Sequence, residues 1–517
     1  MWRRPCVLRS RRSLSVRRFS TAFVGGDAPL APVKLYVIAG EASGDAIGAK
    51  VVRALKRHPQ SLEFRGIGGP QMCEAGGFES LFPMQELSVM GLVEVVPYLW
   101  RFRRRIQDTL RDIEEFQPEL VLTIDSKGFT FRVLKALQAS EQQSGARRVK
   151  KAHYVAPSVW AYKHRGKRDF SELKQLLDVM FTILPFEEEV FRAGDLRQKD
   201  DATGERTWCH FVGHPAVEDF LEVHGVYDTV PSGIVPDNDC LPDDAVEVGT
   251  DALLDLSKFE PNRLLARGQL LQVLAANGRE SSARARVRED HGIPTDAFVI
   301  CALVGSRANE VKKSSQLVIE AIEEFKRRNK SGRDDQIYVV FPTIAAVKEE
   351  VNTHIAAIAP GVQCRVLTDL DAGARLRLFQ SSDLAVAVSG TIVLETTLAT
   401  LPTVVIYRAN RLTEWIAQRL AAVRFVSVPN LLLGRSLIPE LLFSGCTAPK
   451  IADALERLQQ HPLGERDALQ LAMAVSTLTK WKEAHAGTEA SLRPIRASDL
   501  VAKHILNVLA EEEYPQL

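Results

Sequence analysis

Short apolar runs alternate with amphipathic segments along most of the chain, and this alternation limits the fold more than any other feature. Residues 35–39 form a continuously apolar run, and Ile47, Val51, Val52 and Leu55 then repeat with the period of an α-helix. A strand that is apolar on both faces belongs in a parallel sheet covered by helices on both sides. The pattern therefore predicts an α/β fold made of repeated β-α units.

The alternation forms two series, which divide the chain into two domains. In the first series, apolar runs lie at 34–39, 62–69, 119–125, 150–162, 178–186 and 209–215. In the second series, they lie at 296–304, 336–343, 364–370, 382–408 and 425–434. We predict two Rossmann-like, doubly wound domains that face a central cleft, one over 31–221 and one over 291–448.

Two further segments flank the second domain. Residues 222–290 include a Pro-, Gly- and Asp-rich stretch at 230–251, which predicts a linker or insertion that is partly disordered. Residues 449–517 are predicted to form C-terminal helices.

The first 30 residues have a composition of their own. They contain seven arginines, interspersed serines and no acid before Asp27, and no long apolar stretch follows the charges. This composition favours a mitochondrial transit peptide over 1–30, with a disordered basic tail as the alternative. No run reaches the roughly 18 apolar residues of a membrane span, so we expect any membrane contact to be peripheral, at the inner mitochondrial membrane.

Net charge and cysteine placement argue against two classes of function. The formal net charge is +1, which gives no electrostatic case for nucleic-acid binding. The seven cysteines are scattered without a C-x-x-C pair, which argues against a structural zinc site. We expect neither a metal nor a cofactor.

A glycine-containing turn links the first predicted strand to its helix and carries Gly40, Glu41, Ser43, Gly44 and Asp45. Such a turn lets the backbone approach a ligand closely, and the helix start offers unpaired N–H groups. It lacks the dinucleotide G-x-G-x-x-G pattern, which disfavours NAD. The alternative is a tight connection in which Ser43 or Asp45 caps the helix.

Asp125 ends another predicted strand, in the sequence Thr-Ile-Asp-Ser-Lys-Gly-Phe over 123–129. Open α/β sheets bind ligands at this edge, where a carboxylate could accept the proton of an attacking hydroxyl. The alternative role is a helix N-cap.

The second domain opens with a comparable turn at Gly305, Ser306 and Arg307. The planar guanidinium of Arg307 suits bidentate phosphate binding. The alternative is a surface arginine near a turn.

Ser389, Gly390 and Thr391 precede a predicted helix that contains Glu395. The helix start favours a diphosphate, and Glu395 could accept hydrogen bonds from ribose hydroxyls. Asn430, predicted on a loop after a strand, could also reach the cleft. Ordinary capping, a solvated glutamate and a turn-forming asparagine are the alternatives.

The stretch 89–105 combines apolar, aromatic and basic side chains. It could lie among lipid headgroups or cover the acyl chains of a lipid substrate, and the alternative is a helix with one buried and one basic face. The candidate residues for this contact are Met90, Leu92, Val93, Leu99, Trp100, Phe102 and Arg103.

Several motifs together resemble the lipid-A-disaccharide synthases. They are AGEASGD (39–45), ELSVMGLVEV (86–95), HYVAPSVWA (153–161), LPFEEEVF (184–191), FVGHP (211–215), GSR (305–307), SGTIVLE (389–395) and VPNLLLGR (428–435). They occur in the family's order across most of the chain beyond residue 33, which is far more specific than a single glycine-rich turn.

The resemblance implies a GT-B fold and an inverting transfer from UDP-2,3-diacylglucosamine to 2,3-diacylglucosamine 1-phosphate. It places Asp125 at the family's proposed general base. It places Arg307, the 389–395 segment and Asn430 at positions linked to UDP binding or activity, and the region near Trp100 at the membrane and acyl chains. The implied partners are the UDP-sugar donor, the acylated glucosamine phosphate acceptor and membrane lipid, and we also consider a homodimer.

The chain departs from the family's bacterial pattern. Where bacterial relatives have Asp-Ala-Pro-Asp-Phe, this chain has Asp-Ser-Lys-Gly-Phe over 125–129, so the first acid is retained and the second is lost. Together with residues 1–30, this points to a eukaryotic organellar member. The rival functions are a UDP-N-acetylglucosamine 2-epimerase and a non-catalytic protein that binds lipid or nucleotide sugars.

Overall fold

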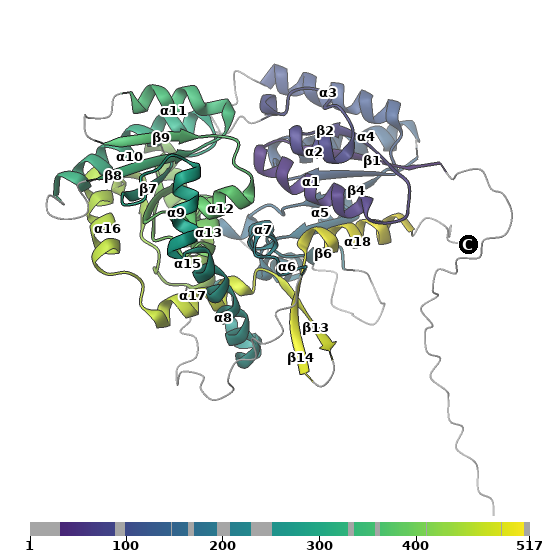
Figure 1. Cartoon of the computed structure of the whole chain (residues 1–517). Coiled ribbons are helices and arrows are strands. Elements are labelled where there is room, and N and C mark those ends of the chain that lie inside the picture. The colour runs from purple at the N-terminus through teal and green to yellow at the C-terminus, as the bar shows by residue number, and fades with distance from the viewer. Residues whose placement is uncertain are drawn as a thin grey trace, which may run out of the picture.

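Two six-stranded parallel sheets, each covered by helices on both faces, make up the two lobes of the computed structural model (Figure 1). The structure describes residues 31–87, 99–145, 147–163, 170–193, 207–228, 251–328, 336–356, 362–409, 411–486 and 489–510. The predictions for residues 1–30 and for Met90, Leu92 and Val93 lie outside these residues, as do the side chains of Leu99 and Trp100.

The first lobe contains the sheet with strand order β2-β1-β3-β4-β5-β6. Its strands are β1 (Val33–Ala39), β2 (Leu62–Ile67), β3 (Leu120–Ile124), β4 (Lys150–Tyr154), β5 (Val179–Thr182) and β6 (Cys209–Phe211). Its helices are α1 (Ala42–Lys56), α2 (Pro70–Gly76), α3 (Leu99–Phe116), α4 (Lys127–Ser144), α5 (Ser171–Leu176), α6 (Pro185–Ala193) and α7 (Pro215–Val223). All neighbouring strands run parallel, as their apolar sequences predict.

The second lobe contains the sheet with strand order β12-β11-β10-β7-β8-β9. Its strands are β7 (Phe298–Leu303), β8 (Ile337–Pro342), β9 (Gln363–Leu367), β10 (Leu384–Val388), β11 (Thr403–Tyr407) and β12 (Glu440–Leu442). Its helices are α8 (Pro261–Gly278), α9 (Ser281–Asp290), α10 (Ala308–Arg328), α11 (Lys348–Ile355), α12 (Ala372–Ser381), α13 (Ile392–Leu398), α14 (Arg411–Leu420), α15 (Val428–Leu433), α16 (Ala448–Gln460) and α17 (Glu465–Ser476). The predicted α/β class with two doubly wound domains is confirmed.

Each sheet has one point at which the direction of strand addition reverses. The first sheet grows from β1 to β2 and then resumes on the other side of β1 with β3. The second grows from β7 through β8 to β9 and then resumes beside β7 with β10. Ligands of open α/β sheets bind beyond the carboxyl ends of the strands at such reversals, so both lobes present a binding edge there.

The chain returns to the first lobe at its C-terminal end. A hairpin of β13 (Lys480–Ala486) and β14 (Glu489–Ile495) precedes α18 (Ala497–Ala510), which runs under the first lobe in Figure 1. Val501, Ala502 and Ile505 of α18 are buried in the first-lobe core with α1. The prediction of helices throughout 449–517 is therefore wrong over the hairpin.

Two further predictions need correction. The described part of 222–290 is not a linker, because α8 and α9 occupy most of 251–290 and pack on α17 and α12. The run at 425–434 is not a strand that enters a loop, because its second half forms α15. In both cases apolar helix residues lie close to proline, a pattern that favours the prediction of an irregular or extended segment.

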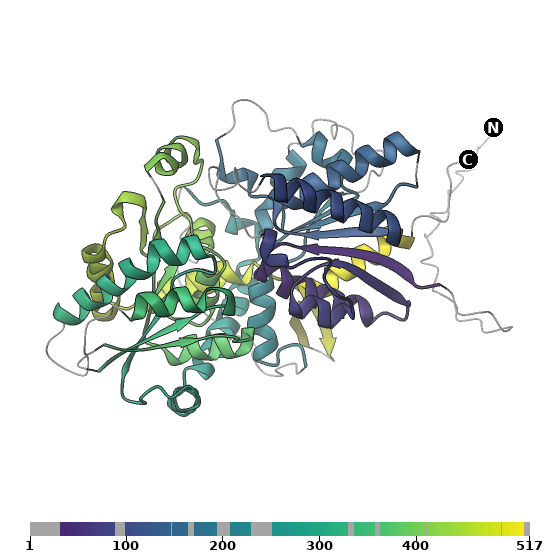
Figure 2. The ribbon, with the colours of Figure 1, turned by 90° about the horizontal axis from the view of Figure 1, so that it is seen from above.

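The lobes share buried core as well as a boundary. One hydrophobic cluster joins Trp160, Phe186 and Phe220 of the first lobe to Val299 and Val393 of the second. The view from above shows the two lobes meeting along this junction (Figure 2). Within the described residues, no helix has the length and apolar character needed to cross a membrane.

Candidate functional site

Three strand-to-helix turns meet between the lobes. Asp125 directly follows β3, and Glu41 follows β1 one residue after Gly40. Arg307 lies in the turn between β7 and α10, and its Nη2 forms an ion pair with Oε2 of Glu41. Burial raises the pKa of Asp125, and the charge of Arg307 acts on this carboxyl by opposing that rise. The structure thus brings the predicted base and the predicted phosphate-binding arginine to one interlobe site.

The backbone at Asp125 has an unusual conformation. Asp125 and Ser126 have φ values of 49° and 47°, in the left-handed region that costs energy for residues other than glycine. The hydroxyl of Thr130 donates to the Asp125 carbonyl at 2.9 Å, and the Asp125 N–H donates to the Tyr154 carbonyl at 2.9 Å. Two neighbouring elements therefore hold this turn, and such strain is concentrated at functional sites.

The absence of a side chain at Gly40 allows the turns after β1 and β3 to pack closely. A Cβ at Gly40 would lie 2.3 Å from the Ser126 Oγ, so only glycine permits the β1–α1 and β3–α4 turns to approach so closely. Ser126 Oγ is buried and has no hydrogen-bond partner among the described residues. The role of Gly40 is thus to bring the backbones of Glu41 and Asp125 together.

Burial and neighbouring charge set the proton affinity of the two carboxyls. Burial raises the pKa of Asp125, while the backbone N–H of Ser126 and the charges of Arg307 and Lys127 oppose that rise. Burial likewise raises the pKa of Glu41, with Arg307 opposing and Asp125 adding to the rise. A carboxylate with a raised pKa is a stronger base than an ordinary aspartate.

Arg307 has a second partner within its own lobe. Its Nη1 donates to Oε1 of Glu310 at 2.6 Å, and Oε2 of Glu310 accepts from the Ser306 N–H at 3.3 Å. Gly305 has φ of +105°, which lets the chain reverse before α10. Burial lowers the pKa of Arg307, but Glu41 and Glu310 raise it on balance, so the guanidinium is held charged.

The loop between β10 and α13 is open. Gly390 and Thr391 are exposed and Ser389 is partly buried, and nothing lies within 4 Å of a Cβ built at Gly390. Thr391 stands at the start of α13, and its side chain makes no capping hydrogen bond. This loop belongs to the strand next to β7, so it lies at the same edge of the sheet as Arg307.

Glu395 is occupied by an ion pair. Its Oε2 accepts from Nε of Arg375 on α12 at 2.5 Å. Burial raises the pKa of Glu395, and Arg375 opposes that rise. Lys50 on α1 pairs with Asp219 on α7 at 2.5 Å, and both also act on Glu395 through their charges. Glu395 is therefore part of a polar cluster between the lobes, not a solvated helix residue.

Asn430 has no hydrogen-bonding capacity left for a ligand. It lies in α15 rather than on a loop, and its side chain is buried. Its Nδ2 donates to the Ile438 carbonyl at 2.8 Å and to Oε1 of Glu440 at 2.9 Å. Its Oδ1 accepts from the N–H groups of Leu437 and Ile438, both at 3.0 Å. The expectation that it reaches the cleft is therefore wrong for this conformation.

Asp45 is also a structural residue, though not as a cap of its own helix. Its carboxylate accepts from the N–H groups of Gly69, Gln71 and Met72 at 2.9–3.2 Å, which caps α2. Among the remaining turn residues, Ser43 is exposed on α1 and Gly44 packs against Ile124. Of the predicted turn residues, Gly40 and Glu41 lie at the meeting of the turns, whereas the Asp45 side chain is engaged at the start of α2.

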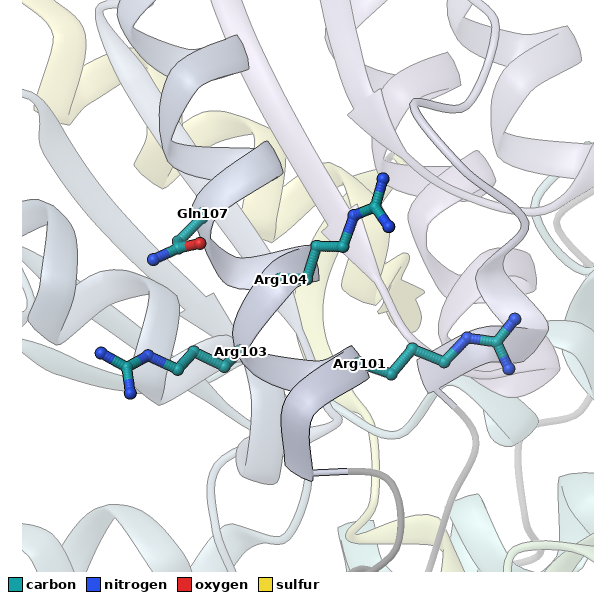
Figure 3. Close-up of a pocket in the computed structure, with 4 residues that line it drawn as sticks. All are labelled: Arg101, Arg103, Arg104 and Gln107. Carbon is teal, nitrogen blue, oxygen red and sulfur yellow. The ribbon is translucent and has the colours of Figure 1, made fainter.

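The start of α3 presents a basic surface. Arg101, Arg103 and Arg104 are exposed, and with Gln107 they line a pocket from which the side chains fan outward (Figure 3). Arg101 pairs with Glu86 at 3.4 Å, while no acidic side chain in the described residues pairs with Arg103 or Arg104. Phe102 turns the other way and meets Phe129 of α4 edge-on at 5.3 Å. The predicted contact residue Phe102 is thus partly internal, and Arg103 is on the outer face.

Sequence reasoning missed Glu310 and Arg375, which pair with the selected residues Arg307 and Glu395. Glu310 had a signal, because a glutamate three residues after an arginine at a helix start can pair with it. Arg375 lies 20 residues from Glu395 on another helix and had none. In the described residues, no group of three His, Cys, Asp or Glu side chains is arranged to hold a metal ion.

A family model described as lipid-A-disaccharide synthetase matches residues 35–224 and 274–479, which is most of the chain. The chain belongs to the lipid-A-disaccharide synthase family. The family that its motifs predicted is thereby confirmed. The match includes Glu41, Asp125, Arg307 and Glu395, so the interlobe site lies within the family's common part.

Relatives from bacteria and a plant agree with this assignment. The chain is 34% identical over 429 residues to the lipid-A-disaccharide synthase of Granulibacter bethesdensis, covering 83% of this chain and 86% of the relative. It is 33% identical over 438 residues to the probable mitochondrial lipid-A-disaccharide synthase of Arabidopsis thaliana, covering 82% and 79%.

Solved structures are similar to this lipid-A-disaccharide synthase family member at low identity. One is a UDP-GlcNAc 2-epimerase from Neisseria meningitidis bound to UDP-GlcNAc, with a TM-score of 0.48 and 11% identity, covering 93% of this chain and 100% of that one. Another is MurG from Acinetobacter baumannii, with a TM-score of 0.42 and 11% identity, covering 92% and 100%. The family assignment does not depend on these similarities.

Proposed function

We propose that this protein is an inverting glycosyltransferase that joins UDP-2,3-diacylglucosamine to 2,3-diacylglucosamine 1-phosphate. The products are lipid A disaccharide 1-phosphate and UDP. Family membership supports the reaction class. The observation that supports the residue roles is the meeting of Asp125 and Glu41 from one lobe with Arg307 from the other.

Asp125 is the proposed general base. As the acceptor's 6-hydroxyl oxygen attacks C1 of the donor, its proton passes to the Asp125 carboxylate and the C1–oxygen bond to UDP breaks. Burial makes Asp125 more basic, and its left-handed backbone directs it from the end of β3. Attack on the face opposite the leaving group inverts the anomeric carbon.

Arg307 is the proposed partner of the diphosphate. Negative charge develops on the leaving UDP, and the Arg307 guanidinium with the backbone N–H groups of Gly390 and Thr391 would stabilise it. Glu395 and Asn430 are engaged by Arg375 and by the 437–440 segment, so we assign them to support of this loop. Exclusion of water by the closed lobes would favour sugar as the attacking group.

A transfer assay with the full chain tests this proposal. The UDP-diacylglucosamine donor and the acylated sugar phosphate acceptor are mixed with the protein, and mass spectrometry detects the disaccharide and UDP. We expect both products in equal amounts, and none without the acceptor. Absence of the disaccharide with folded protein would reject the transferase. Incubation with UDP-N-acetylglucosamine alone separates the epimerase, since only an epimerase yields the C2 epimer.

We also propose that the start of α3 contacts the membrane that holds the acylated substrates. Three exposed arginines gather there, and Arg103 and Arg104 are available to lipid phosphates. The end of α3 at which they lie adjoins α4 through Phe102 and Phe129, close to Asp125. A membrane on this side would lie near the acceptor.

Vesicle sedimentation tests that contact. Arg103→Glu with Arg104→Glu should reduce binding to vesicles containing anionic phospholipid by at least about thirtyfold, because each basic residue near an anionic surface contributes about 1 kcal/mol and two are lost. Arg147→Glu with Arg148→Glu, just before β4 at the opposite edge of the sheet, is the positional control, and its fold is checked by circular dichroism because Arg148 pairs with Asp178 at 2.7 Å. Equal binding by both double variants and the unmodified protein would reject the α3 surface.

Location and assembly complete the proposal. The relative from Arabidopsis is named mitochondrial, and residues 1–30 have a transit-peptide composition, so we propose import into mitochondria and peripheral attachment to the inner membrane. Fusion of residues 1–30 to a fluorescent protein tests import. We propose a homodimer as the assembly, which sedimentation of the purified protein tests.

A further inference from the structure

The Arg307 guanidinium forms ion pairs with two carboxylates. Nη2 pairs with Glu41 across the lobe boundary, and Nη1 pairs with Glu310 one helical turn away at 2.6 Å. A guanidinium has five N–H donors, and a phosphate binds through the same edge of this group that carboxylates use. A diphosphate that takes the N–H groups facing Glu41 and Glu310 displaces at least one of these carboxylates.

We infer that Glu41 is an exchangeable partner of Arg307, which releases the guanidinium to the donor diphosphate and takes it back when UDP leaves. This inference rests on the proposed function, because it assumes that the diphosphate reaches Arg307. It makes Glu41 a positioning residue that acts through Arg307 and does not touch the reacting atoms.

The two carboxylates are not equivalent, and Glu41 is the one that can leave. Glu310 lies on the same helix as the turn that it stabilises, and it also accepts from the Ser306 N–H. Glu41 lies on the other lobe, at the N-terminal boundary of α1, and its side chain makes no capping bond there. Loss of Glu41 from Arg307 therefore disturbs no hydrogen bond within the second lobe.

The surroundings of Glu41 also favour exchange. Its side chain is 16% exposed. Burial and the negative charge of Asp125 disfavour the charged form of Glu41, so its pKa is raised. A diphosphate brings more negative charge and more acceptor oxygens to the same guanidinium than one carboxylate does. Replacement of Glu41 by a diphosphate is thus electrostatically favourable for Arg307.

Exchange has a consequence for turnover. With the diphosphate bound, Glu41 is freed beside Asp125. After transfer, Glu41 competes again for Arg307 and weakens the hold on UDP. The carboxylate thus lowers product affinity, and its removal should slow product release, a step that limits many enzymes.

Calorimetric titration of UDP into the full-length protein tests the exchange. Glu41→Gln should bind UDP about tenfold more tightly, because the diphosphate no longer displaces a charge-assisted hydrogen bond. Glu41→Asp, whose shorter side chain reaches Arg307 less well, should bind with intermediate affinity. A merely structural role for Glu41 predicts weaker binding in both variants.

Two matched variants make the result decisive. Glu324→Gln removes the carboxylate that pairs with Arg327 and Arg328 near the far end of α10, and UDP affinity should not change. Arg307→Gln should weaken UDP binding. If Arg307→Gln weakens binding but Glu41→Gln does not tighten it, the exchange is rejected and the proposed site stands. If Arg307→Gln has no effect, the diphosphate assignment fails and the exchange fails with it.

Steady-state kinetics gives a second readout. In Glu41→Gln, UDP should inhibit transfer at about tenfold lower concentration, and kcat should fall while KM for the donor falls with it. An unchanged inhibition constant for UDP would contradict the exchange even if kcat fell.

Discussion

The turns after β1 and β7 have the same place in their sheets but opposite charge. Each follows the first strand of its lobe beside the strand reversal, and each contains a glycine shortly before its charged residue. The first turn presents Glu41 and the second presents Arg307, and the two side chains pair across the boundary. Topology thus fixes where the two turns meet, while residue identity decides which lobe supplies the acid and which the cation.

The glycines of the two turns serve different purposes. Gly40 has no side chain because the Ser126 Oγ occupies that space, whereas Gly305 has φ of +105°, which side chains rarely allow. Beside the turn after β1 lies a second carboxylate, that of Asp125. Beside the turn after β7 lies Glu310, which belongs to the helix that follows that turn. The first lobe is therefore equipped for proton transfer and the second for anion binding.

Of the variants considered, substitution of Asp125 should cause the largest loss of transfer rate. Asp125→Asn should lower the transfer rate by on the order of 10³-fold, because a general base contributes about 10²–10⁴-fold. UDP affinity should not fall, because Arg307 is kept and a negative charge close to it is removed. Initial rates and UDP titration measure the two quantities. Full activity of the variant would remove Asp125 as the base, and lost UDP affinity would contradict the division between lobes.

In the turn after β1, a second substitution should restore the stability lost by filling the space at Gly40. Gly40→Ala should destabilise the fold by about 1–3 kcal/mol, because the new Cβ overlaps the Ser126 side chain. Ser126→Gly in the same chain should restore most of this loss, since it removes the obstruction and tolerates φ of 47°. Urea unfolding measures the free energies.

Two other glycines serve as controls for that rescue. Gly128→Ala meets nothing within 4 Å in the first turn of α4 and should not destabilise the protein. Gly305→Ala should destabilise it through its φ of +105° and also because the new Cβ would lie 2.7 Å from Cβ and Oε2 of Glu310, so a smaller side chain at 310 should recover only part of the loss. Full rescue at Gly305, or absence of rescue at Gly40, would show that the two glycines do not differ as described.

The smallest effect expected is a shift in pH dependence. The carboxylate of Asp125 is the active form, its pKa is raised by burial, and the charge of Arg307 opposes that rise. Arg307→Gln removes the opposing charge, so the pKa should rise further and activity should be lost at a higher pH on the acid side. The profile of kcat/KM against pH measures this limb. A limb that stays in place or moves to lower pH would mean that Arg307 does not act on the base.

Local patterns predicted eleven of the twelve strands of the two sheets, with β12 missed, but they did not predict the partners of every site residue. Apolar runs before turns identified β1, β3 and β7, and strand ends correctly located Asp125 and Arg307. The pairing of Asn430 with the 437–440 segment and of Glu395 with Arg375 was not predicted, because these partners lie on other elements. Hydrogen bonding between distant elements leaves no periodic signal in the sequence.

The same limit applies to larger pieces. The proline- and aspartate-rich stretch near 230–251 dominated the prediction for 222–290, although residues 261–278 have the leucine spacing of a helix. Asp45 satisfied the rule for a cap of its own helix, but it caps α2, which follows β2. Sequence rules identified the capping chemistry, and the packing of α1 on α2 decided which helix receives it.

The return of α18 to the first lobe affects the order in which the protein can mature during synthesis. Glu218 of α7 accepts from the N–H and hydroxyl of Ser498, and Val501 and Ile505 complete a core begun by β1 and α1. The first-lobe core therefore cannot be completed until α18 has been synthesised, which happens after the whole second lobe. The earlier lobe is the later one to finish, and until then the apolar side of α1 is a surface for chaperones to shield.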